Sequence, residues 1–450
     1  MGIDKSYKKN RIIIMLIGLA GMTGYMLPYL RWYYYDAYMA YFNVNDMQMG
    51  IIGSVYGTIA IVGYCAGGWV ADRFSLKIIV PGSLLVTGLG GLLLLTKPGF
   101  GLHVAIYAIW GITSVLTFWN PLMKSLRALV NPDEQARSYA LFDMTRGLLN
   151  FFSGLAFAAL FTSIVAKATE ASGLRTIILA YTIWAIVVSV IVYFALKDRL
   201  PDFSKTLKKD GGNADAQFIK NVIRVLKMPT TWLLIIPMFA SYSVIISYSY
   251  VVPYCTSMFG MSAGLAAVMG YLAQAFRIGG CFIGGQIADR KGISLVYMAD
   301  VILMAVGVAG LLLCPKSMAF MWLLVVSIGI LAMSMYSAQA LHYAVLEEGA
   351  YPVETMGAAT FIITPLGYAG ESLMPLFNGW CLNNHEGMEG YRIMFTGFIV
   401  LCVIAVVSLI FFRKLSAKRI QELKDIRAAK AAGASGASVD ADAGTADAAE

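Results

Sequence analysis

The sequence predicts an all-α membrane protein with twelve transmembrane helices in two pseudo-symmetric six-helix bundles, and three observations support that prediction. First, 59% of the 450 residues are hydrophobic and only 13% are charged, whereas soluble domains are about 45–50% apolar and about 25% charged. Second, apolar runs long enough to cross a bilayer recur along the whole chain. Third, a short motif occurs once in each half of the chain.

Twelve apolar runs, bounded by charged residues, proline or glycine, have the length of a transmembrane helix. About 20 apolar residues span the ~30 Å hydrocarbon core of a bilayer. Uninterrupted runs such as residues 183–194 lack the alternation of apolar and polar residues that marks membrane β-barrels. The helices are expected near residues 12–35, 50–70, 77–96, 103–123, 139–164, 176–196, 231–256, 263–287, 294–314, 318–341, 355–377 and 391–412.

The distribution of basic residues sets the expected orientation. With both termini in the cytoplasm, 26 of the 34 lysine and arginine residues fall in cytoplasmic segments and only five fall outside, as the positive-inside rule requires. The loop after the tenth span is an exception, because it carries Glu347, Glu348 and Glu354 and no basic residue. The basic start runs into the first apolar stretch without a signal-peptide cleavage site, so this stretch is expected to remain as the first helix. We therefore expect a multi-pass protein of the cytoplasmic membrane.

The composition divides the chain into two helical bundles and three shorter segments. In the linker between the bundles, apolar and basic residues alternate at helical spacing between positions 218 and 227, which predicts an amphipathic helix on the cytoplasmic membrane surface. The Ala/Gly/Ser/Asp-rich stretch from about residue 432 cannot bury a core and is expected to be disordered. The segments are the cytoplasmic N-terminus 1–11, the N-terminal bundle 12–196, the basic cytoplasmic linker 197–230, the C-terminal bundle 231–412 and the cytoplasmic tail 413–450.

A repeated motif relates the two halves. Residues 67–73 read GGWVADR, and residues 284–290 read GGQIADR, 217 positions later. An approximate match of residues 140–142 to residues 358–360 has nearly the same offset. Two homologous halves, each forming one bundle, are therefore expected.

This repeat resembles the signature of the major facilitator superfamily, a G-x-L-a-D-R-x-G-R-[RK] loop between helices 2 and 3 with a weaker copy between helices 8 and 9. Ser75 and Leu76 replace the usual glycine and arginine of the first copy. The resemblance extends over residues 12–412. Segments between residues 118 and 148 look more like nitrate/nitrite porters and sugar-phosphate or organophosphate permeases than like proton antiporters, which carry an arginine in helix 4. The residues that match the first copy are Gly68, Ala71, Asp72, Arg73 and Lys77.

The resemblance implies a secondary transporter that works by alternating access of its two bundles. It also implies that Asp72, Arg73, Asp289 and Arg290 latch the cytoplasmic side in the outward-facing state. A small residue such as Gly68 allows close approach of helices in lipid, and Asp72 is expected to lie against the positive N-terminus of a facing helix. These residues are therefore expected to control gating.

Two arginines within spans are candidate substrate ligands, because a cation in the bilayer core costs at least about 2.5–3.5 kcal/mol. Arg277 is expected about 18 Å from the cytoplasmic boundary, near the midplane, where transporters of this architecture bind substrate. The alternative for Arg277 is a structural pair with an acid such as Glu371. Arg31 resembles in its placement the helix 1 arginine of organophosphate antiporters. Its alternatives are pairing with Asp36 and a position at the outer interface.

Helices 5 and 11 are expected to carry the groups that gate or couple transport. Asp143 and Arg146 are three residues apart and therefore lie on one face of helix 5, either as a cytoplasmic gate or as a self-neutralised pair. Glu371 is taken as the single deep acid of the second half, about 24 Å from Thr355 along helix 11. It is the candidate carrier of a coupling proton.

Aromatic and amide side chains complete the candidate substrate site. Tyrosine hydroxyls on cavity helices can donate to substrate oxygens, and packing or a place in the aromatic belt is the alternative for each. Asparagine and glutamine within spans are either cavity hydrogen-bonding groups or contacts between helices. The candidates are Tyr29, Trp119, Asn120, Tyr248, Gln274 and Tyr368.

Missing motifs exclude several chemistries. The sequence contains no GxxxxGK[ST] loop for ATP hydrolysis, and no H-E-x-x-H or Cys/His set for a metal centre. We expect a monomer without cofactor, metal or nucleic-acid partner. The expected partners are membrane lipid, a small solute, and a coupling proton or counter-anion.

The sequence thus predicts a secondary active transporter, not an enzyme, that moves a small organic or phosphorylated anion. In the main alternative the solute is neutral or lipophilic, and the arginines pair internally with Glu371, Asp36 and Asp143. A non-transporting membrane sensor or an intramembrane enzyme is the remote alternative.

Overall fold

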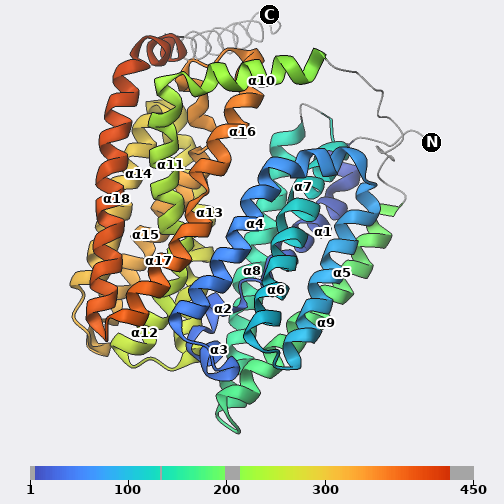
Figure 1. The fold of residues 1–450 in the computed structure, drawn as a ribbon, viewed down its shortest axis with the longest axis vertical. Helices are drawn as coiled ribbons and strands as arrows, with labels where there is room; N and C mark the ends of the chain where they lie inside the picture. Colours follow the sequence, from blue (N-terminus) through green and yellow to red (C-terminus); the bar gives the residue numbers. More distant parts are fainter. Residues whose placement is uncertain (1–5, 132–133, 198–212, 426–450) are drawn as a thin grey trace, which may run out of the picture.

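The computed structural model describes residues 6–131, 134–197 and 213–425, and these residues form helices joined by short connections. The expected disorder of the tail from residue 432 lies outside the described residues. Figure 1 shows two groups of long helices, α1–α9 and α11–α18, side by side. The prediction of two helical bundles is therefore confirmed.

The first group contains the helices before the linker. They are α1 (Tyr7–Met26), α2 (Leu30–Tyr33), α3 (Tyr35–Phe42), α4 (Asp46–Arg73), α5 (Leu76–Leu95), α6 (Phe100–Gly111), a π-helical segment (Ile112–Trp119), α7 (Asn120–Ala128), α8 (Gln135–Val165) and α9 (Glu170–Lys197).

The linker and the second group follow. They comprise α10 (Asn213–Leu226), α11 (Pro229–Ser247), a 3₁₀ turn (Tyr248–Tyr250), α12 (Val251–Phe259), α13 (Ala263–Lys291), α14 (Ile293–Leu313), α15 (Met321–Leu341), α16 (Met356–Gly367), α17 (Gly370–Asn384) and α18 (Met388–Leu415), with further 3₁₀ turns at Met318–Phe320, Ala344–Gly349 and Val353–Thr355.

The spans agree with the sequence prediction except where two of them are interrupted. Among the described residues, ten helical stretches are long and apolar enough to cross a membrane. The first span is instead divided into α1, α2 and α3, and the eleventh into α16 and α17. Pro28 explains the end of α1, because proline has no N–H to donate to the preceding turn. The expected ends of these two spans, at residues 35 and 377, are wrong, since the helices continue to Phe42 and Asn384.

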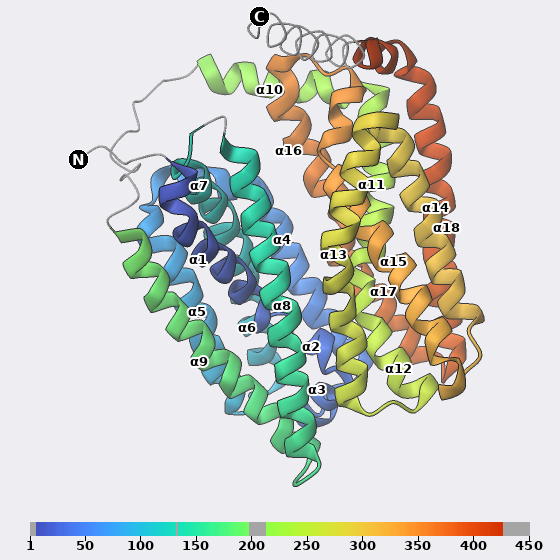
Figure 2. The same cartoon turned by 180° about the vertical axis from the view of Figure 1, so that it is seen from behind.

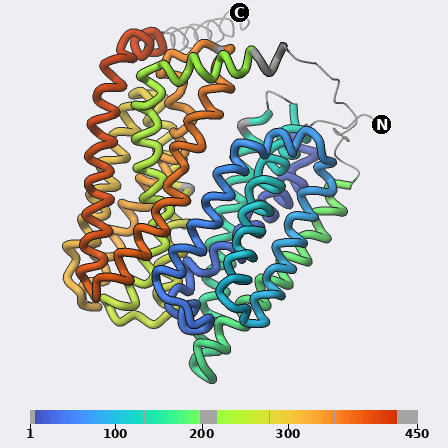
Figure 3. The backbone as a smooth tube through the Cα atoms, viewed as in Figure 1, coloured from blue at the N-terminus to red at the C-terminus, as the bar shows by residue number. Residues whose placement is uncertain are grey.

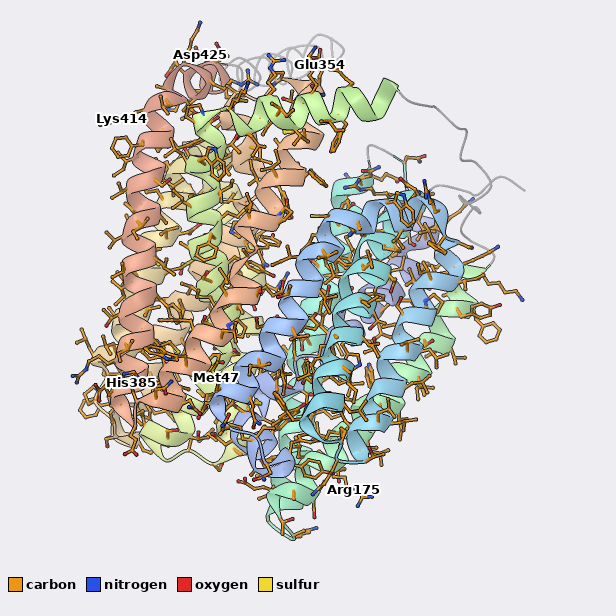
Figure 4. The ribbon with its side chains drawn as sticks, in the orientation of Figure 1. Met47, Arg175, Glu354, His385, Lys414 and Asp425 are labelled. Carbon is orange, nitrogen blue, oxygen red and sulfur yellow. The ribbon has the colours of Figure 1, made fainter. Side chains whose placement is uncertain are left out.

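The two bundles are close at one end and diverge toward the other. Figures 1 and 2 show that α10 crosses the end at which the bundles are apart, which we call the α10 end. The tube in Figure 3 shows the same divergence of the two backbones. At the opposite end, α4 packs against α17, α3 against α12, and α8 against α13. Figure 4 places Arg175, Met47 and His385 at this opposite end, and Lys414 and Glu354 at the α10 end.

The contact between α4 and α17 closes the space between the bundles at the end opposite α10, and we call this contact the floor. Gly50, Gly53 and Gly57 recur at helical spacing and face α17. A Cβ atom placed on Gly57 would overlap the carbonyl oxygen of Glu371, and one on Gly50 would lie 2.5 Å from that of Pro375. Only glycine fits so close to the facing backbone, as in other close helix contacts in membranes.

The two glycines of each copy of the repeated motif differ in their surroundings. A Cβ atom on Gly67 would overlap Asn120, and one on Gly284 would overlap Ser337. A Cβ atom on Gly68 or on its repeat counterpart Gly285 would have no neighbouring atom within 4 Å. The expectation that Gly68 permits a close helix contact is therefore wrong for this conformation, because the bundles are apart where it lies.

Helix α10 confirms the amphipathic helix predicted in the linker. Val225, on one face of α10, is fully buried, whereas Ile219 and Ile223 on its other face are exposed. The side-chain amide of Asn221 donates to the carbonyl oxygen of Glu354 at 3.1 Å. These contacts attach α10 to the end of the second bundle, beside α16.

The packing of the floor can be tested with a glycine-to-alanine substitution, made separately at two positions of α4. Gly57→Ala forces a methyl group against the backbone of α17, and overpacking of this kind costs about 1–3 kcal/mol. We expect the melting temperature of the purified protein to fall by several degrees. Gly68→Ala is the matched control and should leave it unchanged or slightly raised, because alanine favours helix where there is space. Equal melting temperatures for both variants would contradict the floor packing.

Candidate substrate cavity

A cavity of about 1070 Å³ lies between the two bundles. Helices α1, α4, α7 and α8 line it from the first bundle, and α11, α13, α15 and α16 from the second. It extends from Tyr29 and Tyr242, above the floor, to the exposed side chains of Asp72 and Arg127 at the α10 end. Its position between repeats is the usual place for substrate in transporters built from two repeats.

Two arginines from opposite bundles share one carboxylate in this cavity. On α8, the Arg146 guanidinium lies 2.9 Å from a carboxylate oxygen of Asp143. On α13, the Arg277 guanidinium lies 3.7 Å from the same oxygen. Both arginine side chains are mostly buried, whereas Asp143 is 55% exposed. The three groups together leave one uncompensated positive charge facing the cavity.

Aromatic rings hold both guanidinium groups. Arg277 lies 4.9 Å from the centre of the Tyr336 ring, and Arg146 lies 5.1 Å from the ring centre of Trp119. Gln274 donates to the Tyr336 hydroxyl at 3.0 Å, which fixes that ring in turn. Cation–π contacts contribute about 0.5–2 kcal/mol, and more where water is excluded. The arginines are therefore held in place without being neutralised by the rings.

Three cavity tyrosines lie where helices are interrupted. Tyr29 precedes α2, Tyr248 begins the 3₁₀ turn after α11, and Tyr368 follows α16. The Tyr29 ring stacks on Trp32 at 3.8 Å, and the Tyr368 ring stacks on Tyr242 at 4.0 Å. Interrupted helices at the midplane are a common way to bring polar groups to a transporter site.

Most of the candidate substrate residues line the cavity. The Tyr248 hydroxyl already donates to the carbonyl oxygen of Met269 at 2.7 Å, and the Asn120 amide donates to that of Gly63 at 3.4 Å. The candidates that line the cavity are Arg277, Tyr29, Trp119, Asn120, Tyr248, Gln274 and Tyr368.

Arg31 lies outside the cavity lining, within the floor. Its side chain is 3% exposed, and its guanidinium contacts Gly53 of α4. Its Nε atom has no hydrogen-bond partner among the described residues. Pairing with Asp36 is wrong for this conformation, because Asp36 accepts a hydrogen bond from Thr256 at 2.5 Å and forms no ion pair with Arg31 in the described part of the chain.

Glu371 is also buried below the cavity. Its two carboxylate oxygens accept hydrogen bonds from Tyr29 at 3.4 Å and Tyr242 at 3.2 Å. The alternative pairing of Arg277 with Glu371 is wrong, since the carboxylate beside Arg277 is that of Asp143. Glu371 is not the only deep acid of the second bundle either. Asp300 is buried on α14, where it accepts a hydrogen bond from Ser337 at 2.6 Å.

The motif residues lie at the α10 end. Asp72 pairs with Lys124 of α7 at 2.6 Å, rather than with a helix N-terminus as expected. The reason is that the bundles are apart at this end, so Asp72 finds its partner within its own bundle. Arg73 stacks over its neighbour Trp69 at 4.2 Å. The last charged residues of α13 are exposed there as well, namely Asp289 and Arg290.

Sequence reasoning missed Asn150 and left Tyr336 out of the candidate site, although both residues line the cavity. Asn150 could have been found, because it lies four residues after Arg146 and seven after Asp143, on the same face of α8. Tyr336 is one of several tyrosines within the predicted spans, and nothing in the sequence singles it out. Its role depends on the packing of α15 against α13, which places its ring under Arg277.

Comparisons with known proteins identify the family. The model of the Major Facilitator Superfamily matches residues 11–375. The chain belongs to this superfamily. It is 27% identical to the inner membrane protein YihN of Escherichia coli K12, over 92% of this chain and 97% of that protein. It is 25% identical to the inner membrane protein YqcE of the same organism, over 90% and 95%.

Solved structures of superfamily transporters share the fold. A point mutant of the nucleoside transporter NupG has a TM-score of 0.70 at 13% identity, covering 89% of this chain and 99% of that one. A bacterial homologue of the human lysosomal transporter Spinster, in an inward-facing and unoccupied conformation, has a TM-score of 0.70 at 14% identity, covering 92% and 98%. The expected fold of twelve transmembrane helices in two bundles is therefore confirmed.

The shared carboxylate can be tested by neutralising it. Asp143→Asn leaves two guanidinium groups without an anion, so the melting temperature at low salt should fall. An inorganic anion should then stabilise this variant more than the unmodified protein, because it can take the place of the carboxylate. The measurement compares melting temperatures in about 50 mM sodium phosphate and in sodium chloride of the same ionic strength, so that general screening is equal.

Asp72→Asn is the control for this test, because Asp72 pairs with a lysine at the exposed end of the cavity. It should show no specific response to phosphate. An Asp143→Asn protein that melts like the unmodified protein, with no phosphate effect, would contradict the charge balance described here.

Proposed function

We propose that this superfamily member transports a small organic anion that binds between Arg146 and Arg277. The observation that supports this is the shared carboxylate of Asp143, which leaves a net positive charge between the bundles. A carboxylate, phosphate or sulfonate group on the solute can accept charge-assisted hydrogen bonds from both guanidiniums. The rest of the cavity is aromatic and polar, so the body of the solute is expected to carry rings or hydroxyl groups.

The positions of the two arginines also suggest how binding drives the conformational change. Arg146 belongs to the first bundle and Arg277 to the second, so an anion held by both draws the bundles together above the floor. A ligand shifts a conformational equilibrium only by its difference in affinity for the two states. An anion that contacts both arginines binds more weakly when the bundles separate there, because one of the two contacts is lost.

We infer that the α10 end faces the cytoplasm and that this conformation is inward-facing. The excess of lysine and arginine at this end supports the orientation. The fold match to a transporter solved in an inward-facing conformation agrees with it. We also propose a location in the cytoplasmic membrane, as for the inner membrane relatives.

The anion site is tested by ligand binding to arginine variants. A thermal-shift screen against sugar phosphates, sugar acids, sulfonates, nucleosides and dipeptides identifies a stabilising compound, whose affinity is then measured by calorimetry. Arg277→Lys keeps the charge but loses the planar fork, so we expect weaker binding. Arg277→Ala should remove binding almost completely, by about 2–4 kcal/mol.

Arg175→Ala is the matched control, since Arg175 lies at the end opposite α10 and away from the cavity (Figure 4). It should bind the compound like the unmodified protein. If Arg277→Ala also binds its compound unchanged, the anion is excluded and the neutral-solute alternative becomes the better account.

A further inference from the structure

The charged groups at the mouth of the cavity are balanced or hydrated. Asp72 pairs with Lys124 at 2.6 Å, so their charges cancel. Arg127 is exposed at the α10 end, where it donates to the Tyr139 hydroxyl at 2.5 Å. Water therefore screens the one charge at the mouth that has no opposite charge beside it in the described part of the chain.

The charged groups farther in are not balanced. Arg146, Asp143 and Arg277 form an upper charge layer, and the two arginine side chains are only 16% and 18% exposed. They are the remaining charged groups among the described residues that line the cavity. Arg31 and Glu371 form a separate, lower charge layer within the floor, outside the lining. The upper layer thus presents two positive charges and one negative charge to a solute.

A single atom of Asp143 contacts both arginines. Its Oδ1 oxygen lies 2.9 Å from the Arg146 guanidinium and 3.7 Å from that of Arg277. Each guanidinium has five N–H donors, so contact with one oxygen leaves donors on both for a bound group. Asp143 therefore lowers the net charge of the site to one without preventing the two arginines from binding an anion.

The net charge of a water-poor site determines which anion it favours. Attraction to the site increases in proportion to the charge of the anion, whereas the cost of removing the anion from water increases with the square of its charge. A monoanion leaves the upper charge layer neutral. A dianion costs more to dehydrate and leaves one negative charge uncompensated when the bundles close around it, which is unfavourable.

We propose that Asp143 determines the charge of the transported solute, and that the site selects a singly charged group over a doubly charged one. The favoured solutes carry a carboxylate, a sulfonate or a sulfate ester, and phosphate monoesters are disfavoured. This inference rests on the anion transport proposed above and narrows it. Asp143 acts through its charge on the two arginines, so it need not touch the solute.

The test uses methyl sulfate and methyl phosphate, which share a tetrahedral group and differ by one charge. At pH 8 the phosphate ester is a dianion, because its second ionisation lies near pH 6. Each probe is titrated into the purified full-length protein at constant ionic strength, adjusted with sodium chloride. The rise in melting temperature gives the apparent affinity. The same titrations of Arg277→Ala give the salt effect that does not come from the site.

The unmodified protein should bind methyl sulfate at least about tenfold more tightly than methyl phosphate. Asp143→Asn raises the net charge of the site to two, so the preference should reverse. Asp143→Glu retains the carboxylate and should keep the original preference. The double variant Asp143→Asn with Arg146→Gln returns the net charge to one. It should again prefer methyl sulfate, with weaker affinity for both probes because one guanidinium is lost.

Glu170→Gln is the matched control, because it removes one negative charge at the start of α9, outside the cavity lining. It should keep the preference of the unmodified protein. Size-exclusion profiles establish that each variant is folded. The preference of the unmodified protein needs no substitution, so an unstable variant does not prevent a decision.

Two results overturn the inference while leaving an anion site. They are equal or tighter binding of methyl phosphate to the unmodified protein, and an unchanged preference in Asp143→Asn. Absence of a specific response to both probes in every variant also overturns it. The proposed function is decided separately, by the binding of the screened compound to the Arg277 variants.

Discussion

Two guanidinium groups on opposite bundles share one carboxylate, and the proposed transport of an anion depends on this imbalance of charge. Asp143 can satisfy Arg146 and Arg277 only in part, since its oxygen is 2.9 Å from one and 3.7 Å from the other. A buried charge without compensation is costly. In the proposed function, the anionic solute compensates this charge and binds where the two bundles approach each other.

The floor below this site depends on a different constraint, which is the absence of side chains on one face of α4. Gly50, Gly53 and Gly57 let the backbones of α4 and α17 touch, and this contact surrounds Arg31 and Glu371. Charge in a close helix contact must balance within a few ångströms, because such a contact excludes the water that would screen it. The floor therefore holds two buried ionisable side chains where the backbones of the two bundles are in contact.

Both charge layers span the boundary between the bundles. Arg146 and Arg277 sit above the floor on α8 and α13, whereas Glu371 joins Tyr29 and Tyr242 within it. In the proposed function, an anion held by both arginines favours approach of the bundles at the α10 end.

The sequence by itself determined the membrane fold, because hydrophobic length and the repeated GGxxADR motif are local properties of the chain. It also placed Arg277 near the midplane and Asp143 beside Arg146, since helical spacing fixes depth and face. Only the tertiary structure decided the partners. Arg277 found Asp143 instead of Glu371, Arg31 was buried beneath the cavity instead of lining it, and Asp72 paired with Lys124. The reason is that these partners lie on different helices, and which helices meet depends on the packing of small residues and on which end of the bundles is closed.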